Sequence, residues 1–98
     1  MKSARAANSL TALLEDPYWQ VRVKAARSLG KLGDPSAVPA LGRNLDIAVI
    51  SNVRKEAAAA LGEIADPSAR PLLEPYSGDP DPDVRKLVRW ALQKIEKL

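Results

Sequence analysis

Residues 53–65 read VRKEAAAALGEIA, and this stretch decides the fold. A similar stretch comes before it, VRVKAARSLGKLG at 21–33, and another follows it, VRKLVRWALQKIE at 84–96. Each begins with Val-Arg, has Leu eight positions after the Val, and has a second aliphatic residue three positions further on. Since these positions fall on one face of an α-helix, the stretches predict three copies of one amphipathic helix.

The three copies belong to a longer period in the sequence. Three positions recur at intervals of 32 and 31 residues, namely Arg22/Arg54/Arg85, Leu29/Leu61/Leu92 and Leu32/Ile64/Ile95. The tetrapeptide Asp-Pro-Ser-Ala at 34–37 also returns 32 residues later, at 66–69. Matches at so many positions indicate tandem duplication, with units at about 1–33, 34–65 and 66–98.

Two helices are predicted in each unit, at 3–15 and 18–32, at 35–45 and 51–65, and at 67–75 and 81–97. Gly33 suits the left-handed residue that ends a helix, and Asp34 can cap the next helix with Pro35 in its first position. Pro39 lies one turn into that helix and should bend or restart it, because proline cannot donate the helical hydrogen bond. We therefore expect an all-α fold, a right-handed α-solenoid (superhelix) of three helix hairpins in one domain, residues 1–98.

The composition excludes several kinds of site. The 98 residues include neither Cys nor His, which removes disulfides, thiol nucleophiles, zinc sites and imidazole acid–base chemistry. The net charge of +3 arises from both signs spread along the chain, unlike the single-sign field of a dedicated nucleic-acid binder. No apolar run resembles a signal peptide or could span a bilayer. We expect no cofactor, no membrane association and a cytoplasmic location.

The pattern D-P-x-x-x-V-R-x-x-A-A-x-x-L-G-x-L-G-D-P-x-A-V-P-x-L occupies residues 16–41 and recurs in weaker form through the third unit. It resembles a HEAT repeat of the phycobilisome-lyase-like type. The resemblance implies the fold more than the function, because that family includes scaffolds, chromophore lyases, metal-dependent hydroxylases and a DNA-repair glycosylase branch. The His-Glu metal motif that the hydroxylase branch implies has no counterpart here, since the chain has no His.

The sequence departs from this pattern in the turn before the middle helix. The turn at 46–52 is one residue longer than its counterpart and is apolar where Asp-Pro is expected. Its Ile47-Ala48-Val49-Ile50 run can form a tip that binds a partner or a patch for self-association. It can equally fold over the helix ends or extend the following helix by a turn.

The outward face of the three copied helices is the main candidate binding surface. It is predicted to carry Val23, Lys24, Arg27 and Lys31, then Lys55, Glu56, Ala59 and Glu63, then Lys86, Leu87, Trp90 and Lys94. A groove that follows phosphates needs like charge across the repeats, whereas this face is basic, then acidic, then partly apolar. The pattern favours a protein partner. Trp90 is the best single candidate for contact with that partner, although it can also cap the open end of the stack.

Arg22, Arg54 and Arg85 form a ladder with one arginine in each unit. One interpretation is a row of donors for phosphate or carboxylate groups. The favoured interpretation is structural: each arginine pairs with an aspartate of a nearby turn and ties adjacent units together. The aspartates available for this are Asp16, Asp46, Asp79 and Asp83.

The predicted function is that of a non-enzymatic protein–protein interaction scaffold that binds its partner through the concave face of the copied helices. Acid–base chemistry has little support, because Glu56 and Glu63 are spaced for successive turns of a solvated face. One alternative is accessory binding of a nucleic acid or nucleoprotein through Lys24, Arg27, Lys31 and Lys86. Another is a non-catalytic subunit of a lyase-type enzyme. A homodimer through the C-terminal end of the stack is also open.

Overall fold

The computed structural model describes residues 2–98, with side chains from residue 5 onward, and these residues form six α-helices and no strand. The helices are α1 (Lys2–Leu13), α2 (Trp19–Leu32), α3 (Val38–Arg43), α4 (Ser51–Ile64), α5 (Arg70–Leu73) and α6 (Pro82–Glu96). Three 3₁₀ turns accompany them: η1 (Pro35–Ala37), η2 (Pro67–Ala69) and η3 (Glu74–Tyr76). The predicted all-α class is confirmed. Met1, the first residue of the predicted unit 1–33, lies outside the described residues.

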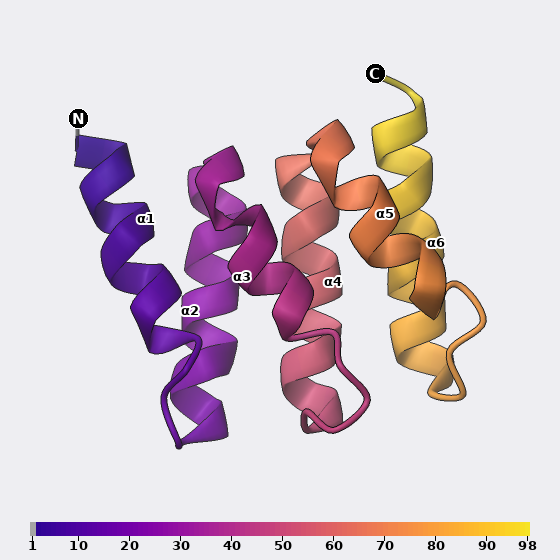
Figure 1. Cartoon of the computed structure of the whole chain (residues 1–98), viewed down its shortest axis with the longest axis horizontal. Helices are drawn as coiled ribbons and strands as arrows, with labels where there is room; N and C mark the ends of the chain where they lie inside the picture. Colours follow the sequence, from indigo (N-terminus) through magenta and orange to yellow (C-terminus); the bar gives the residue numbers. More distant parts are fainter. Residues whose placement is uncertain (1) are drawn as a thin grey trace.

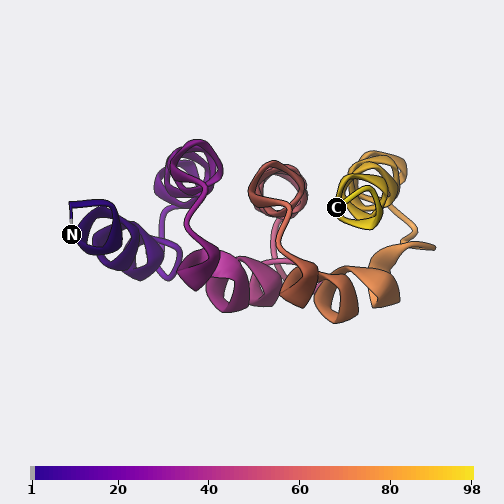
Figure 2. The ribbon, with the colours of Figure 1, turned by 90° about the horizontal axis from the view of Figure 1, so that it is seen from above.

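The helices form two layers, with α1, α3 and α5 in one and α2, α4 and α6 in the other (Figures 1 and 2). Each second-layer helix packs against the next, α2 on α4 and α4 on α6. The three hairpins therefore stack side by side as a solenoid, with the two chain ends at opposite ends of the stack (Figure 1). The molecule measures 35 × 32 × 16 Å, so its thinnest dimension holds only the two layers.

The helix ends follow the signals in the sequence. Gly33, with φ of 69°, is the left-handed residue after α2, and Ala65, with φ of 53°, takes the same conformation after α4. Asp34 accepts a hydrogen bond from the backbone nitrogen of Ser36 at 2.9 Å, as its predicted capping role requires. Asp81 accepts bonds from two backbone nitrogens at the start of α6. These residues therefore mark the ends of α2 and α4 and the starts of η1 and α6.

The first-layer segments predicted as helices at 35–45, with a bend or restart at Pro39, and at 67–75 are each divided in the structure. Each begins as a 3₁₀ turn and restarts as a short α-helix, α3 or α5. Pro39 and Pro71 lie in the first turn of these α-helices, where a missing N–H group is tolerated. The helix therefore restarts beside Pro39, at Val38, which is one of the two outcomes expected there.

The core lies between the two layers and consists of aliphatic side chains. The largest fully buried ones are Leu14, Leu29, Leu41, Leu45, Leu61, Leu73, Val38, Val53, Val84 and Val88. Burying one such side chain is worth about 1.5–3 kcal/mol, so the repeated Val and Leu positions hold neighbouring hairpins together. No helix among residues 2–98 is both long and apolar enough to cross a membrane.

Candidate functional site

The second-layer face is the surface of α2, α4 and α6 that points away from the first layer. The basic side chains predicted for it, Lys24, Arg27, Lys31, Lys86 and Lys94, are exposed. Leu87 is partly buried against the core. The prediction that Val23 is exposed on this face is corrected, because Val23 is only 9% exposed and lies on the side of α2 that packs on α4. The remaining side chains of the face differ between the two places where helices of this layer meet.

At the α2/α4 contact, a charged pair crosses the face. Arg27 Nη2 donates to Glu56 Oε2 at 2.9 Å, and this hydrogen bond raises the pKa of Arg27. Lys55 Nζ lies 3.7 Å from Asp83 Oδ2, so a second pair links α4 to the start of α6. The predicted basic surface of α2 therefore retains only Lys24 and Lys31 as cations with no carboxylate within 4.0 Å among the described residues.

At the α4/α6 contact, the Trp90 ring packs over Gly62. A methyl group built on Gly62 would overlap Trp90 Cζ3 and come within 2.8 Å of Trp90 Cε3, so the ring fits only because Gly62 has no side chain. The ring remains 39% exposed, and Lys94 Nζ lies 5.7 Å from its centroid. Trp90 also lines the outer side of α6, so contact with a partner and capping of the open end both remain predictions.

An open groove follows this contact and is mainly apolar. We call it the α4/α6 groove; it has a volume of 500 Å³ and is lined by Ala59, Glu63, Lys86, Leu87 and Trp90. Ala59 and Trp90 occupy the repeat position that Arg27 occupies in α2. The groove exists because this position is Ala in α4, which leaves Trp90 without the charged partner that Arg27 has in Glu56.

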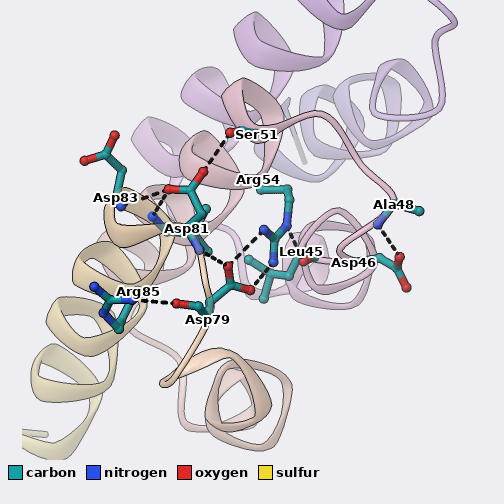
Figure 3. Close-up of polar contacts among 10 residues, drawn as sticks. Leu45, Asp46, Ala48, Ser51, Arg54, Asp79, Asp81, Asp83 and Arg85 are labelled. Atoms are coloured by element: carbon teal, nitrogen blue, oxygen red, sulfur yellow. Dashed lines mark hydrogen bonds and ion pairs between the residues drawn. The ribbon is translucent and has the colours of Figure 1, made fainter.

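The arginine ladder gives a buried ion pair at one position. Arg54 Nε donates to the carbonyl oxygen of Leu45 at 2.8 Å, and Arg54 Nη1 donates to Asp79 Oδ1 at 3.1 Å (Figure 3). Arg54 Nη2 donates to Asp79 Oδ2. The two residues are 3% and 4% exposed, and the Tyr76 ring lies 5.6 Å from Arg54 Cζ. The hydrogen bond from Arg54 lowers the pKa of Asp79 and so favours its charged form.

The turn that holds Asp79 is tied to both α4 and α6. Asp79 Oδ1 accepts from the backbone nitrogen of Asp81 at 2.9 Å. Asp81 Oδ2 accepts from Ser51 Oγ at 2.8 Å, which lowers the pKa of Asp81 (Figure 3). Arg85 Nη1 donates to the carbonyl oxygen of Asp79 at 2.8 Å. The second and third hairpins are therefore joined by a connected polar network.

The other two arginines of the ladder depart from the predicted pairing with aspartate side chains. Arg85 contacts the main chain of Asp79 and not its carboxylate, because that carboxylate is taken by Arg54. Arg22 has a buried Nε atom with no hydrogen-bond partner among the described residues. The carboxylate of Asp46, the nearest aspartate of the next turn, accepts from the backbone nitrogen of Ala48 at 2.8 Å instead.

The apolar turn at 47–50 does not extend the following helix, because α4 begins at Ser51. Ile47 is 68% exposed and Ile50 is 43% exposed, whereas Val49 is partly buried. A hydrogen bond of 2.9 Å from the backbone nitrogen of Val49 to the carbonyl oxygen of Asp46 closes the turn. Contact with a partner and self-association remain predictions for this turn.

Two-layer stacking of short helix hairpins, with repeated caps and a repeated core, defines an α-solenoid of the HEAT type. The family model for HEAT repeats matches residues 1–49 and 50–97, and the chain belongs to this family. Among solved structures, it is similar to human deoxyhypusine hydroxylase in complex with glycerol, with a TM-score of 0.88 and 32% sequence identity. That similarity covers 94% of this chain and 32% of the hydroxylase, so the chain spans about a third of its length. A search of curated proteins gives no match.

HEAT repeats are generally scaffolds for protein interaction, which agrees with the coarse part of the predicted function. The prediction that the chain is not an enzyme is corrected by the likeness to deoxyhypusine hydroxylase, because an enzyme uses the same repeat fold. A repeat frame keeps its core while its surface side chains change, so the same fold serves enzymes as well as binding proteins. The finer assignment to the phycobilisome-lyase-like type stays a prediction.

Proposed function

We propose that the chain is a protein-binding HEAT module that takes an apolar side chain of its partner into the α4/α6 groove. The observation that carries this proposal is the composition of the groove. Ala59, Leu87 and the exposed part of Trp90 give it apolar walls along a face that is otherwise charged. Aromatic side chains that are partly buried beforehand lose little conformational freedom on binding, which makes Trp90 a suitable anchor.

The charges at the rim favour a protein partner over a nucleic acid. Glu63 and Lys86 carry opposite charges at the edges of the groove, so they can orient a partner segment that offers both signs. Arg27, one of the cations proposed for a nucleic-acid surface, is already paired with Glu56. A row of like charges, which phosphate contacts require, is not formed along this face.

Loss of affinity on blocking the groove tests the proposal. Proteins that the wild-type chain captures and the Ala59→Glu variant does not are identified by mass spectrometry and purified. Trp90→Ala should weaken their binding by about 30-fold or more, as expected for a hot-spot aromatic residue. Lys31→Ala, on the α2 side of the same face, is the matched control and should leave the affinity within about twofold.

Two results would refute this assignment. One is unchanged affinity for both groove variants. The other is an affinity that falls steeply with added salt and depends on Lys24, Lys31 and Lys86, which would identify phosphate contacts as the source of binding.

A second candidate function follows from the 32% identity to deoxyhypusine hydroxylase, namely a part in a hydroxylase-type HEAT enzyme. The residues of this chain do not fit the His-Glu metal motif expected for that branch, since the sequence has no His. Among the described residues, no group of three or more acidic side chains could hold a metal ion. Incubating the purified chain with a deoxyhypusine-containing protein and analysing the product by mass spectrometry tests this candidate; a hydroxylated product supports it, and an unmodified substrate removes it.

A further inference from the structure

Arg22 and Arg54 occupy the same position in successive repeats, yet they meet different groups in the next turn. Arg54 binds the carboxylate of Asp79, which lies five residues before Val84, at the Asp-Pro position of the repeat. The residue five positions before Val53 is Ala48. The turn facing Arg22 therefore lacks a carboxylate where the turn facing Arg54 has one.

The aspartate of the middle turn lies two residues before the repeat position, and its carboxylate accepts a hydrogen bond within its own turn. Asp16 and Asp79 each lie five residues before a Val and accept a hydrogen bond from the backbone nitrogen two residues later. Asp46 forms the same local turn, by accepting from the backbone nitrogen of Ala48, but it lies seven residues before Val53. Asp46 is exposed, whereas Asp79 is buried. The shift keeps the turn and removes the partner of the arginine.

As a consequence, Arg22 has a hydrogen-bond donor that lacks an acceptor among the described residues. Its Nε atom is buried and has no hydrogen-bond partner among the described residues, and no carboxylate lies within 4.0 Å of its guanidinium there. A buried donor in this state is unfavourable in free energy, and more so when the group is charged. A ligand that supplies acceptors would recover that free energy.

Arg22 faces a concave surface that has the remaining features of a binding site. We call it the Arg22 pocket; it has a volume of 530 Å³ and includes Arg43, Val49, Ile50 and Tyr76. Arg43 Nε lies 3.9 Å from Glu15 Oε1, and the two side chains are 66% and 67% exposed. This ion pair is therefore weak. The pocket thus offers two guanidinium groups beside an aliphatic and aromatic wall.

We propose that the Arg22 pocket binds a carboxylate that carries a short apolar group, independently of the α4/α6 groove. The same chain shows the chemistry at Arg54, whose planar guanidinium binds the two oxygens of one carboxylate. Val49, Ile50 and Tyr76 give the apolar group its contacts. Asp46 also lines the pocket, and its negative charge opposes a doubly charged phosphate more strongly than a single carboxylate.

The carboxylate can belong to a small molecule or to a peptide. Isovalerate represents the first source. N-acetyl-glycyl-valine, with a free terminal carboxylate, represents the second. Isovaleramide and the amide of the same peptide have the shape of these ligands without the charge. Comparing the two acids tells whether the pocket needs a peptide backbone in addition to the carboxylate.

Titration of the 98-residue chain followed by nitrogen-15 NMR tests the proposal. At least one acid should shift the Nε–Hε signal of Arg22 saturably, with Arg54 unaffected, and the two amides should shift neither signal. Arg22→Gln should weaken the binding by about tenfold or more. Ala48→Asp, which puts a carboxylate of the chain beside Arg22, should abolish the titration by either acid, and its folding is checked by circular dichroism.

Several outcomes would overturn the proposal. These are the absence of a saturable Arg22 shift with both acids, an equal response to the amides, tighter binding of inorganic phosphate, or unchanged binding by folded Ala48→Asp. Should Arg22→Gln fail to fold, Ala48→Asp still decides the result, because it leaves Arg22 in place.

Discussion

The two joints of the solenoid are built on the same arginine and differ in what that arginine meets. The first joint is the contact of the first and second hairpins, and the second joint is that of the second and third. At the second joint, Arg54 and Asp79 form a buried ion pair. At the first joint, Arg22 has a buried Nε atom that finds no acceptor in the described part of the chain, and the ion pair between Arg27 and Glu56 lies on the surface.

The difference shows that one repeat position can have different uses in different copies. Where the turn keeps Asp at the Asp-Pro position, the arginine joins hairpins; where Ala48 replaces it, the arginine becomes available to a ligand. The second-layer face also differs between the joints. The pair of Arg27 with Glu56 crosses it at the first joint, whereas the α4/α6 groove opens at the second. Function is therefore expected where a copy departs from the repeat, at Arg22 and at Trp90.

The largest expected effect is that of removing the carboxylate at the second joint. Asp79→Ala leaves Arg54 buried without its partner and should lower the free energy of unfolding by about 3–5 kcal/mol. Asp46→Ala, which removes the aspartate of the turn at the first joint, loses one exposed hydrogen bond and should lower it by about 1 kcal/mol or less. Urea unfolding measures both. Equal losses would mean that the two joints do not differ in this way.

Acid should weaken the second joint more than the first. The pKa of Asp79 is lowered in the folded chain by the hydrogen bond from Arg54. Its contribution is thus present above the unfolded aspartate pKa of about 3.9 and is lost as pH falls below that value through the folded pKa. The difference in unfolding free energy between the wild type and Asp79→Asn should therefore shrink from pH 7 to pH 3. A difference that stays constant over that range would contradict the pairing.

A smaller effect is expected from filling the helix contact at the second joint. In Gly62→Ala the new methyl group meets the Trp90 ring, so the variant should be destabilised by about 1–2 kcal/mol. Trp90→Ala removes the ring, and in that background the same change should be neutral or stabilising, because Ala favours helix by about 1 kcal/mol. Thermal unfolding of the four chains tests this. Destabilisation that persists in the Trp90→Ala background would locate the clash elsewhere.

The smallest effect is expected from restoring the repeat at the first joint. Ala48→Asp offers Arg22 a carboxylate and should raise the free energy of unfolding by up to about 1 kcal/mol, since Ala48 is exposed and Arg22 is only partly buried. Ala48→Asn has a similar size without the charge and serves as the matched control. A gain shared by both variants would come from the turn and not from Arg22.

The sequence predicts the frame well because the frame depends on local signals. The Val and Leu spacing, Gly33, Asp34 and Pro39 each act within one or two helical turns, and each of these signals agrees with the structure. For the segment at 35–45 the sequence predicts a bend or a restart at Pro39, and spacing alone does not choose between the two.

The sites could be predicted only in part because they depend on contacts between hairpins. The outward face follows from helical angle, but the pair of Arg27 with Glu56 and the packing of Trp90 over Gly62 join residues about 30 positions apart. The sequence marks the turn at 47–50 as unusual, yet the loss of an acceptor for Arg22 depends on the path of that turn. The signal in the sequence that points to this loss is Ala48, because the repeat has the Asp of Asp-Pro at that position.

The most direct test of the difference between the joints is a pair of double-mutant cycles measured by urea unfolding. One combines Arg54→Gln with Asp79→Asn, and the other combines Arg22→Gln with Asp46→Asn. The predicted coupling energy is about 2 kcal/mol or more at the second joint and below about 0.5 kcal/mol at the first. Similar coupling energies in the two cycles would contradict the claim that Arg54 serves the frame while Arg22 is free for a ligand.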